Sequence, residues 1–411
     1  MKKVILTTVI ILSAVFARAE VNLGPINWII NNWSAIDSSY IEPSHYDFVV
    51  MPSYQLSQER FRVKTSDGME MNFRSNTANK LGVSAGWQFL VAGLSWDFNY
   101  HVDQDFDEDR KKTEFSMNIF SQLFNIDLFY RQTGGDFQMT KLDIPSLRDV
   151  KYDGKPINQE LMDEMNDQEY DSRLAGSMIR SKMIGFNGYY IFNHKKFSYP
   201  AAWTNASRQK RSSGSALAGF GYTRHTIDNH LWMLPYIIAS AAASDIIPGL
   251  ETEEQRDNFM KHSNLCTAFR YNDWSFWGGY AYNWVPCKNL LIGASATLGV
   301  GIKKSSGDND VFIECVEELK GILSDTFCAR DPYSFSRTTV DWNAVGRVSV
   351  VWNNDRFFGG GRANVNYYRY RNGDSLMKFD NTFWGTELYF GVKFGASSYW
   401  KKKNGLRGFS I

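Results

Sequence analysis

Nine charged residues lie within otherwise apolar segments of this 411-residue chain, and they are the first candidates for chemistry. They comprise five acids and four bases: Asp97, Glu114, Asp127, Arg131, Asp341, Arg347, Arg362, Glu387 and Lys393. A wet interior lined by such groups could select solutes by charge. In a narrow interior they would instead neutralise one another. Which interpretation applies depends on the elements that carry them.

Two other patterns suggest hydrolysis. Residues 82–86 match G-x-S-x-G, the nucleophile elbow, with Ser84 at the serine position. That motif requires a strand that turns sharply into a helix, whereas this stretch continues as an alternating strand, so we interpret Ser84 as a small strand residue. Of the six histidines, His225 and His230 could support acid-base chemistry at a rim, although neither lies in a metal-binding motif. We predict no catalytic site, no cofactor and no metal site.

Acidic residues and cysteines complete the candidates. An acidic run between Asp103 and Asp109 has alternate aspartates but lacks the glycine of a calcium loop, so we interpret it as a solvated loop. Cys315 and Cys328 flank an amphipathic stretch, and a disulfide between them would close a loop of about 14 residues and stabilise it by roughly 3 kcal/mol. Cys266 and Cys287 are expected at opposite rims and therefore unpaired with each other.

The element that would position the charges is a long alternating strand, most clearly seen at 289–303. Its even positions are apolar and its odd positions are mostly small or polar. Side chains of a strand alternate between two faces, so one face is apolar and the other is not. A soluble strand usually has about 5 to 6 residues, whereas a tilted transmembrane strand needs about 9 to 11.

The same alternation recurs along the chain. Clear examples lie at 80–89, 92–101, 114–123, 126–131, 340–352, 362–367 and 384–394, and further strands are expected at 182–192, 214–226 and 274–284. The regions 45–78, 195–205 and 228–272 are ambiguous. The nine charges follow the polar phase of their strands. Charges facing lipid would cost about 2 to 4 kcal/mol each for Arg or Lys, so the phase places them inside.

The N-terminus carries a predicted targeting signal. Lys2 and Lys3, an apolar run and an A-x-A site before Glu20 predict a cleaved signal peptide over residues 1–19. Its removal takes three of the 45 basic residues and none of the 44 acidic ones, which leaves a net charge of about −2. That balance predicts no nucleic-acid partner. Beyond the signal, no apolar run is long enough for a helical membrane span.

Connections between the strands alternate in length. Short ones are expected at 90–91, 124–125, 285–288 and 353–356, and long polar ones at 102–112, 137–180, 303–338 and 371–381. Outer-membrane barrels place short turns in the periplasm and long loops outside. We therefore predict an all-β fold, an antiparallel up-and-down transmembrane barrel of 12 to 16 strands. The predicted layout is a leader at 20–44, the barrel at 45–395 and a short basic tail at 396–411; a soluble β-sandwich is the alternative.

Several short motifs occur in order along the chain: Asp37-x-x-Tyr40-Ile41, Asn76 to Leu81-Gly82, Asn193 to Phe197-Ser198-Tyr199, Gln209-Lys210-x-x-Ser213-Gly214-Ser215 and Gly279-Tyr280-Ala281-Tyr282. With these motifs the chain resembles an uncharacterised outer-membrane barrel family of Bacteroidota over residues 35–395. The resemblance implies the fold and no activity.

Three functions are compatible with these features. We favour a non-enzymatic barrel for passive passage or surface presentation, with charges that neutralise one another, since a barrel of 12 to 14 strands is narrow. A lipid-modifying enzyme would need a Ser/His/Asp or two-carboxylate cluster at a rim. An adhesion or partner-binding protein would use the loops 137–180 and 303–338. The expected partners are outer-membrane lipid and the barrel-assembly machinery.

Overall fold

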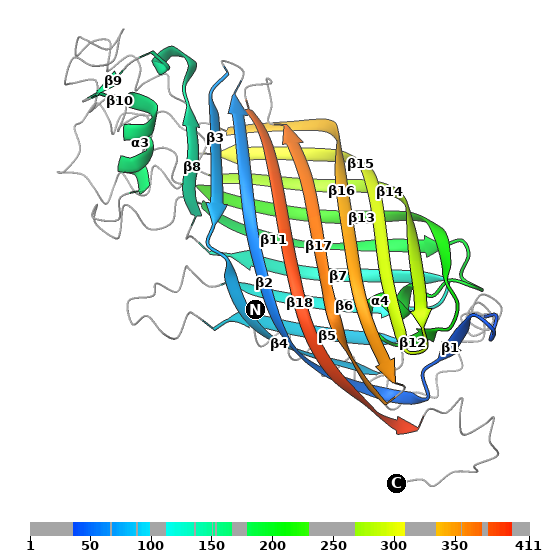
Figure 1. Ribbon diagram of the computed structural model, residues 1–411. Helices are drawn as coiled ribbons and strands as arrows, with labels where there is room; N and C mark the ends of the chain where they lie inside the picture. The colour runs from blue at the N-terminus through cyan, green and yellow to red at the C-terminus, as the bar shows by residue number, and fades with distance from the viewer. Residues whose placement is uncertain are drawn as a thin grey trace.

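Twelve strands form one closed antiparallel barrel in the computed structural model, which describes residues 36–396 except 66–67, 88, 99–111, 135–136, 150, 153, 167–178, 230–267, 309–333, 355 and 372–376 (Figure 1). The ring closes because β18 pairs with β2. In ring order the strands are β2 (Tyr46–Thr65), β4 (Ala78–Trp87), β5 (Leu90–Asp97), β6 (Thr113–Phe120), β7 (Phe124–Thr133), β11 (Ile179–Ile191), β13 (Ser213–Asn229), β14 (Ala268–Cys287), β15 (Leu290–Asp308), β16 (Ser334–Asn354), β17 (Phe357–Arg371) and β18 (Met377–Ala396). The predicted fold class is confirmed, at the lower end of the expected strand number.

Some predictions concern residues outside the described part. They are the signal peptide, most of the leader, the acidic run at 103–109, His230, the position of Cys266, the disulfide between Cys315 and Cys328, and nearly all of the C-terminal tail. Cys287 is described and is an exposed free thiol at the end of β14, next to the short turn where the sequence predicts it.

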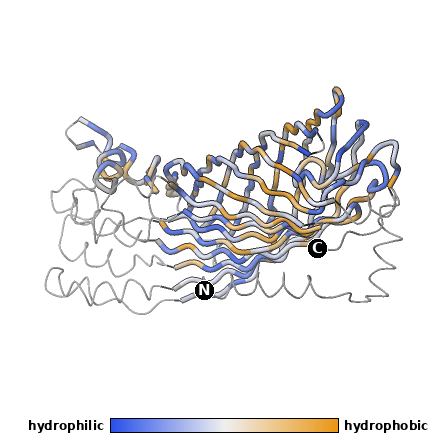
Figure 2. The backbone as a smooth tube through the Cα atoms, turned by 90° about the horizontal axis from the view of Figure 1, so that it is seen from below, coloured by the Kyte–Doolittle hydropathy of each residue, from blue (hydrophilic) through white to orange (hydrophobic). Residues whose placement is uncertain are grey.

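The apolar and polar faces of the strands lie as the alternation predicts. On β15, Leu298, Val300 and Ile302 are exposed on the outside of the barrel, whereas Thr297 and Lys303 are buried on the inside. Figure 2 shows hydrophobic and hydrophilic colours alternating along the barrel strands. The outer surface therefore carries the side chains that suit lipid, and the interior carries the polar ones.

The two ends of the barrel differ. Short turns join β4 to β5, β6 to β7, β14 to β15 and β16 to β17 at one end, which we call the turn end, and β2 begins and β18 ends there. The turn after β14 is two residues long, and Asn289 adopts a left-handed backbone with φ 74°. Asparagine tolerates this conformation better than most residues. We call the opposite end the loop end.

The loop end carries additional structure. β3 (Glu70–Ser75) pairs with the outer part of β2, and β8 (Phe137–Asp143) pairs with β3. Beyond β8 follow a 3-10 turn (Pro145–Leu147), β9 (Lys151–Tyr152), β10 (Lys155–Pro156) and α3 (Ile157–Asn166). The segment expected as a long polar loop thus contains regular secondary structure (Figure 1). Its apolar residues Phe137, Leu147 and Ile157 are buried, which is why it folds back onto the barrel.

The turn end contains a short plug. Helix α4 (Tyr199–Trp203) is completely buried, and β12 (Ser207–Gln209) after it pairs with β1 (Ile41–Pro43) from the leader. Ser198 caps the helix by accepting a hydrogen bond from the Ala201 amide, and Pro200 suits its first turn. No helix in the described part of the chain is long and apolar enough to cross a membrane.

The two largest apolar clusters among the described residues lie inside the barrel at different heights. The outer cluster, at the loop end, comprises Phe61, Val63, Met71, Phe73, Phe137, Met139, Leu142, Leu147, Ile157, Leu161, Ile179, Met183, Ile227, Phe269, Tyr271, Tyr368, Tyr370 and Phe379. The inner cluster, at the turn end, comprises Ile191, Phe197, Tyr199, Ala201, Ala202, Trp203, Leu217, Ala281, Leu291 and Val351. The polar interior lies between them.

Candidate functional site

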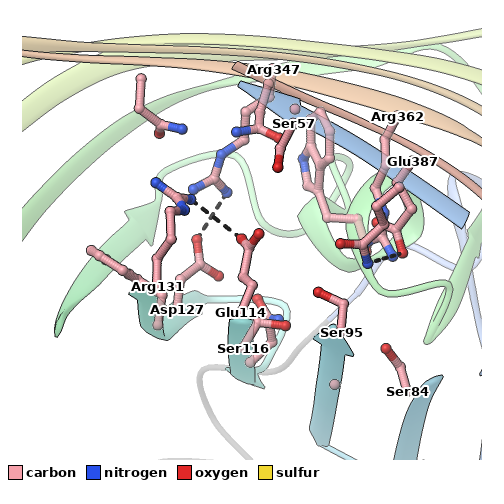
Figure 3. Close-up of a pocket in the computed structure, with 18 of the residues that line it drawn as sticks. Ser57, Ser84, Ser95, Glu114, Ser116, Asp127, Arg131, Arg347, Arg362 and Glu387 are labelled. Carbon is pink, nitrogen blue, oxygen red and sulfur yellow. Dashed lines mark hydrogen bonds and ion pairs between the residues drawn. The ribbon is translucent and has the colours of Figure 1, made fainter. Parts of the chain in front are cut away.

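A cavity of about 220 Å³ lies inside the barrel between the two clusters, and six of the nine predicted charges line it (Figure 3). They are Glu114, Asp127, Arg131, Arg347, Arg362 and Glu387, accompanied by inward-facing serines such as Ser57, Ser84, Ser95 and Ser116. We call this cavity the chamber. It is smaller than the roughly 300 to 1,000 Å³ of drug-sized ligand sites, and it has room for a group of waters or one small solute.

The first ion cluster in the chamber joins strands β4, β6 and β7. Glu114 on β6 lies opposite Arg131 on β7, and its two carboxylate oxygens lie 3.1 Å from Lys80 Nζ and 3.3 Å from Arg131 Nη2. The Arg131 guanidinium also covers the ring of Phe383, with its carbon 3.2 Å from the ring centroid. Phe383 belongs to β18, so the Arg131 side chain reaches across the barrel to a strand that is not adjacent to β7.

The second pair crosses the barrel. Arg347 Nη1 on β16 lies 2.9 Å from Asp127 Oδ2 on β7, and the same nitrogen donates to the Tyr199 hydroxyl of α4 at 3.0 Å. Four strands separate β7 from β16 by the shorter route around the ring. The pair therefore ties opposite walls to each other and to the plug.

The third pair seals the chamber against α4. Arg362 Nε on β17 donates to Glu387 Oε2 on β18 at 2.6 Å, and its Nη1 donates to the Trp203 carbonyl of α4. Gln55 on β2 donates to the other oxygen of Glu387 at 3.3 Å. All three chamber acids thus have a guanidinium partner, which suits mutual neutralisation and leaves none of them placed as a free general acid or base.

The three remaining predicted charges face inward but lie apart from the chamber. Asp97 lies opposite Lys80 on the neighbouring strand. Asp341 is buried towards the loop end, where its Oδ2 lies 2.8 Å from Arg371 Nε. Lys393 is buried near the turn end and donates to Asn353 Oδ1 at 3.3 Å. The alternation thus predicts their inward direction, whereas their height in the barrel depends on register.

A buried cluster absent from the sequence predictions lies at the chamber's outer side. Lys303 Nζ lies 3.4 Å from Asp273 Oδ2, and the Asn343 amide donates to the same oxygen at 2.7 Å. The Lys303 and Asp273 side chains are only 1% and 2% exposed. Both residues follow the inward phase of their strands, so extending the phase of β14 and β15 by a few residues would have found them.

A serine and a histidine also meet inside the barrel. Ser181 Oγ on β11 lies 2.9 Å from His225 Nε2 on β13 and donates to Glu59 Oε1 on β2 at 3.0 Å. In a catalytic triad the acid orients the histidine, whereas here Glu59 contacts the serine and His225 Nδ1 has no partner among the described residues. None of the three is more than 2% exposed, and the rings of Phe61 and Tyr370 pack against His225. The arrangement is that of a structural contact between opposite walls.

No group of three or more metal-ligating side chains occurs among the described residues. Ser84 of the G-x-S-x-G match lines the chamber within strand β4, where no helix follows. The chamber therefore offers paired charges, hydroxyls and amides, which can hold water or a small polar solute.

Comparisons with known proteins find one family and several similar structures. A family model described as a domain of unknown function (DUF4421) matches residues 35–394. Among solved structures, the chain is similar to the outer membrane protease OmpT from Escherichia coli, with a TM-score of 0.36 and 7% identity over 86% of this chain and 98% of that chain. It is also similar to the beta domain of the Bordetella autotransporter BrkA, with a TM-score of 0.33 and 8% identity over 85% of this chain and 100% of that chain.

A third similar structure is the toluene transporter TodX from Pseudomonas putida, with a TM-score of 0.23 and 7% identity over 88% of this chain and 98% of that chain. These likenesses concern the outer-membrane barrel fold alone. No curated protein sequence matches the chain.

Proposed function

The chain belongs to the family described as a domain of unknown function (DUF4421), and we propose that it is a closed, non-enzymatic outer-membrane barrel that presents its loop end at the cell surface. In this proposal the turn end faces the periplasm, residues 1–19 are removed during secretion, and the barrel-assembly machinery inserts the chain into outer-membrane lipid. The motif resemblance supports an origin in Bacteroidota.

Contacts between opposite walls are the observation that carries the closed interior. β2 and β13 are diametrically opposite, with five strands between them in either direction, yet the rings of Phe61 and His225 are 6.0 Å apart. Ser181 and Glu59 are within hydrogen-bond distance across nearly the same width. At this height the lumen has no width left for a solute.

The two apolar clusters would block the path of a solute at two successive heights of the barrel. In the outer cluster Tyr271 and Tyr370 stack at 4.1 Å, and Phe379 lies 5.5 Å from Phe61. In the inner cluster Tyr199 and Trp203 of α4 fill the turn end. A hydrated ion would have to displace packed aromatic side chains twice, which favours a role without conduction.

Planar-bilayer recording tests the proposal. We expect no steady conductance from the purified wild-type protein. Replacing 197–204 with glycine and serine removes the inner cluster's plug and should still give no conductance, because the outer cluster remains. Adding Phe61→Ala and Tyr370→Ala to that variant should open a conducting path. Heat-modifiable migration on gels verifies that each variant is folded.

A steady wild-type conductance would contradict the closed interior. If the combined variant is folded and still shows no conductance, the two clusters are not the barrier to ion passage. For the non-enzymatic part, the test is hydrolysis of phospholipids by wild type and Ser181→Ala. We expect no turnover by either, and turnover that the substitution abolishes would identify an enzyme.

Partner binding through the loop end is a second candidate. The observation that favours it is the ordered segment from β8 to α3, where Ile157 and Leu161 pack into the outer cluster and hold the helix on the barrel. A variant that lacks residues 150–178 should remain folded; loss of capture of a surface partner by that variant would support this function.

A further inference from the structure

A band of basic side chains lies on the outer wall of the barrel towards the loop end, just beyond the apolar surface, on β2 and on the strands from β11 to β18 other than β16. On four strands the next outward-facing residue after the last aromatic or aliphatic one is a base: Lys182 follows Ile184 on β11, Arg224 follows Tyr222 on β13, Lys304 follows Ile302 on β15 and Arg369 follows Tyr367 on β17. These cations therefore lie where a bilayer changes from acyl chains to headgroups.

The remaining bases of the band lie on these and further strands. We define the basic band by its outward-facing members Arg60, Arg62, Lys64, Arg74, Lys141, Arg180, Lys182, Arg224, Arg270, Lys304, Arg369 and Lys378. Among the described residues, four acids share this surface, namely Glu70, Asp143, Asp228 and Asp380. Glu70 binds Arg62, Lys64 and Lys141, and Asp380 binds Arg369, so cations remain in excess over anions in the described part of this surface.

Like charges lie directly opposite each other within the band. Arg60 pairs in register with Arg74, and Lys64 pairs with Lys378. Like charges at directly opposite positions destabilise a sheet. In the second pair Glu70 offsets the charge of Lys64, because its Oε2 lies 3.0 Å from Lys64 Nζ. Among the described residues, no carboxylate lies within ion-pair distance of Arg60, Arg74 or Lys378. A bound anion between Arg60 and Arg74 would turn their repulsion into attraction.

Among the described residues, the wall of the turn end carries no such band. Its last outward-facing residues are aromatic, as at Phe192, Trp284 and Trp352, and all three are about half exposed. The bases at that end, such as Lys195, Lys210 and Lys288, lie in turns and connecting segments beyond the wall. In the described part of the chain, the wall therefore carries more positive charge at headgroup height at the loop end than at the turn end.

We propose that the basic band binds the phosphate groups of a phosphorylated glycolipid in the leaflet around the loop end, that is, of lipid A. Guanidinium and ammonium groups form charge-assisted hydrogen bonds to phosphate, and arginine can do so through two parallel bonds. Neighbouring strands present their cations side by side, so one lipid headgroup can contact bases from two or three strands. The inference rests on the proposed outer-membrane location.

The test measures lipid retention by the full-length protein in nanodiscs. The probes are purified lipid A, the same lipid after enzymatic dephosphorylation, and inorganic phosphate, each diluted into phosphatidylcholine. We expect preferential retention of lipid A that weakens with added salt. Since a base near an anionic surface contributes about 1 kcal/mol, Lys182→Gln, Arg224→Gln and Lys304→Gln together should weaken retention by about 100-fold.

The matched control removes three charges from the other end, through Lys195→Gln, Lys210→Gln and Lys288→Gln, and should change retention less than twofold. Equal retention of the dephosphorylated lipid, or equal losses in the two triple variants, would overturn the inference. Competition by inorganic phosphate at micromolar concentration would show a free-anion site instead. Insertion into phosphatidylcholine vesicles tests the membrane location separately, so the two proposals can fail independently.

Discussion

Substitution of Asp127 by asparagine tests whether the interior ion pairs hold the walls together. The change keeps the side chain's size but leaves the Arg347 guanidinium without its carboxylate, 2.9 Å away in the wild type. Removing one partner of a buried pair costs about 3 to 5 kcal/mol, since an uncompensated charge remains. The two side chains are 19% and 12% exposed towards the chamber, so we expect the lower end, about 3 kcal/mol.

Equilibrium urea unfolding in phosphatidylcholine vesicles, followed by tryptophan fluorescence, measures this free energy. The midpoint should fall with little change of slope, since the folded barrel keeps its surface. The double variant Asp127→Asn with Arg347→Gln should recover part of the loss, with a coupling energy of about 2 kcal/mol. Additive losses in that double variant would refute the reasoning.

The chain supplies a matched control at its surface. Arg148 binds Asp143 through two hydrogen bonds of 2.7 and 3.0 Å, in a pair that is largely open to solvent. Exposed pairs contribute little because water and salt screen them. Asp143→Asn should therefore leave the unfolding midpoint unchanged within error. If Asp127→Asn also leaves the unfolding midpoint unchanged, the cross-barrel pair does not hold the walls together.

Three further predictions concern packing, orientation and pH. Gly299→Val should destabilise the barrel by about 1 to 3 kcal/mol, because a Cβ there would lie 2.8 Å from the indole ring packed against it, whereas Gly346→Ala on the open outer wall should be neutral in the same unfolding assay. Cys287 should react with a membrane-impermeant maleimide only after the outer membrane is permeabilised; mass spectrometry of the labelled peptide would detect reaction in intact cells, which would reverse the orientation. Hydrogen bonds from Ser39 lower the pKa of Asp37 below 3.8, so Ser39→Ala should raise the pKa of Asp37, which NMR titration can measure. The ionised carboxylate stabilises the turn above the ordinary pKa, and this stabilisation is lost as the pH falls through the lowered pKa.

The sequence predicts the direction of interior side chains well, since direction depends only on alternation within one strand. The inward phases of Glu114, Asp127 and Arg347 follow from their immediate neighbours. Which interior residues pair with each other cannot be predicted in this way. Asp127 and Arg347 lie 220 positions apart, and their contact depends on the strand number, on the register of every pair between them and on how far the walls approach.

The sequence does not predict the helix of the plug, for a different reason. Helix α4 is only five residues long, and a segment of that length carries no periodicity that separates helix from strand. Its composition is apolar, as expected for a membrane strand, yet it lies inside the barrel. Only the cap at Ser198 and the proline at position 200 signal a helix start, and such signals also occur in turns.

The small residues on the inward face of β15 connect the closed interior to the sequence. A Cβ at Gly293 would lie 2.8 Å from Ala202 of α4, and one at Gly301 would lie closer still to Asp273 Oδ1. Water would yield to a methyl group, whereas a helix or a paired carboxylate held from several sides cannot. Glycine is therefore needed at these positions only if the lumen is filled. The strand with the clearest lipid-facing pattern thus also argues against a pore, and the surfaces left to act are the basic wall and the loop end.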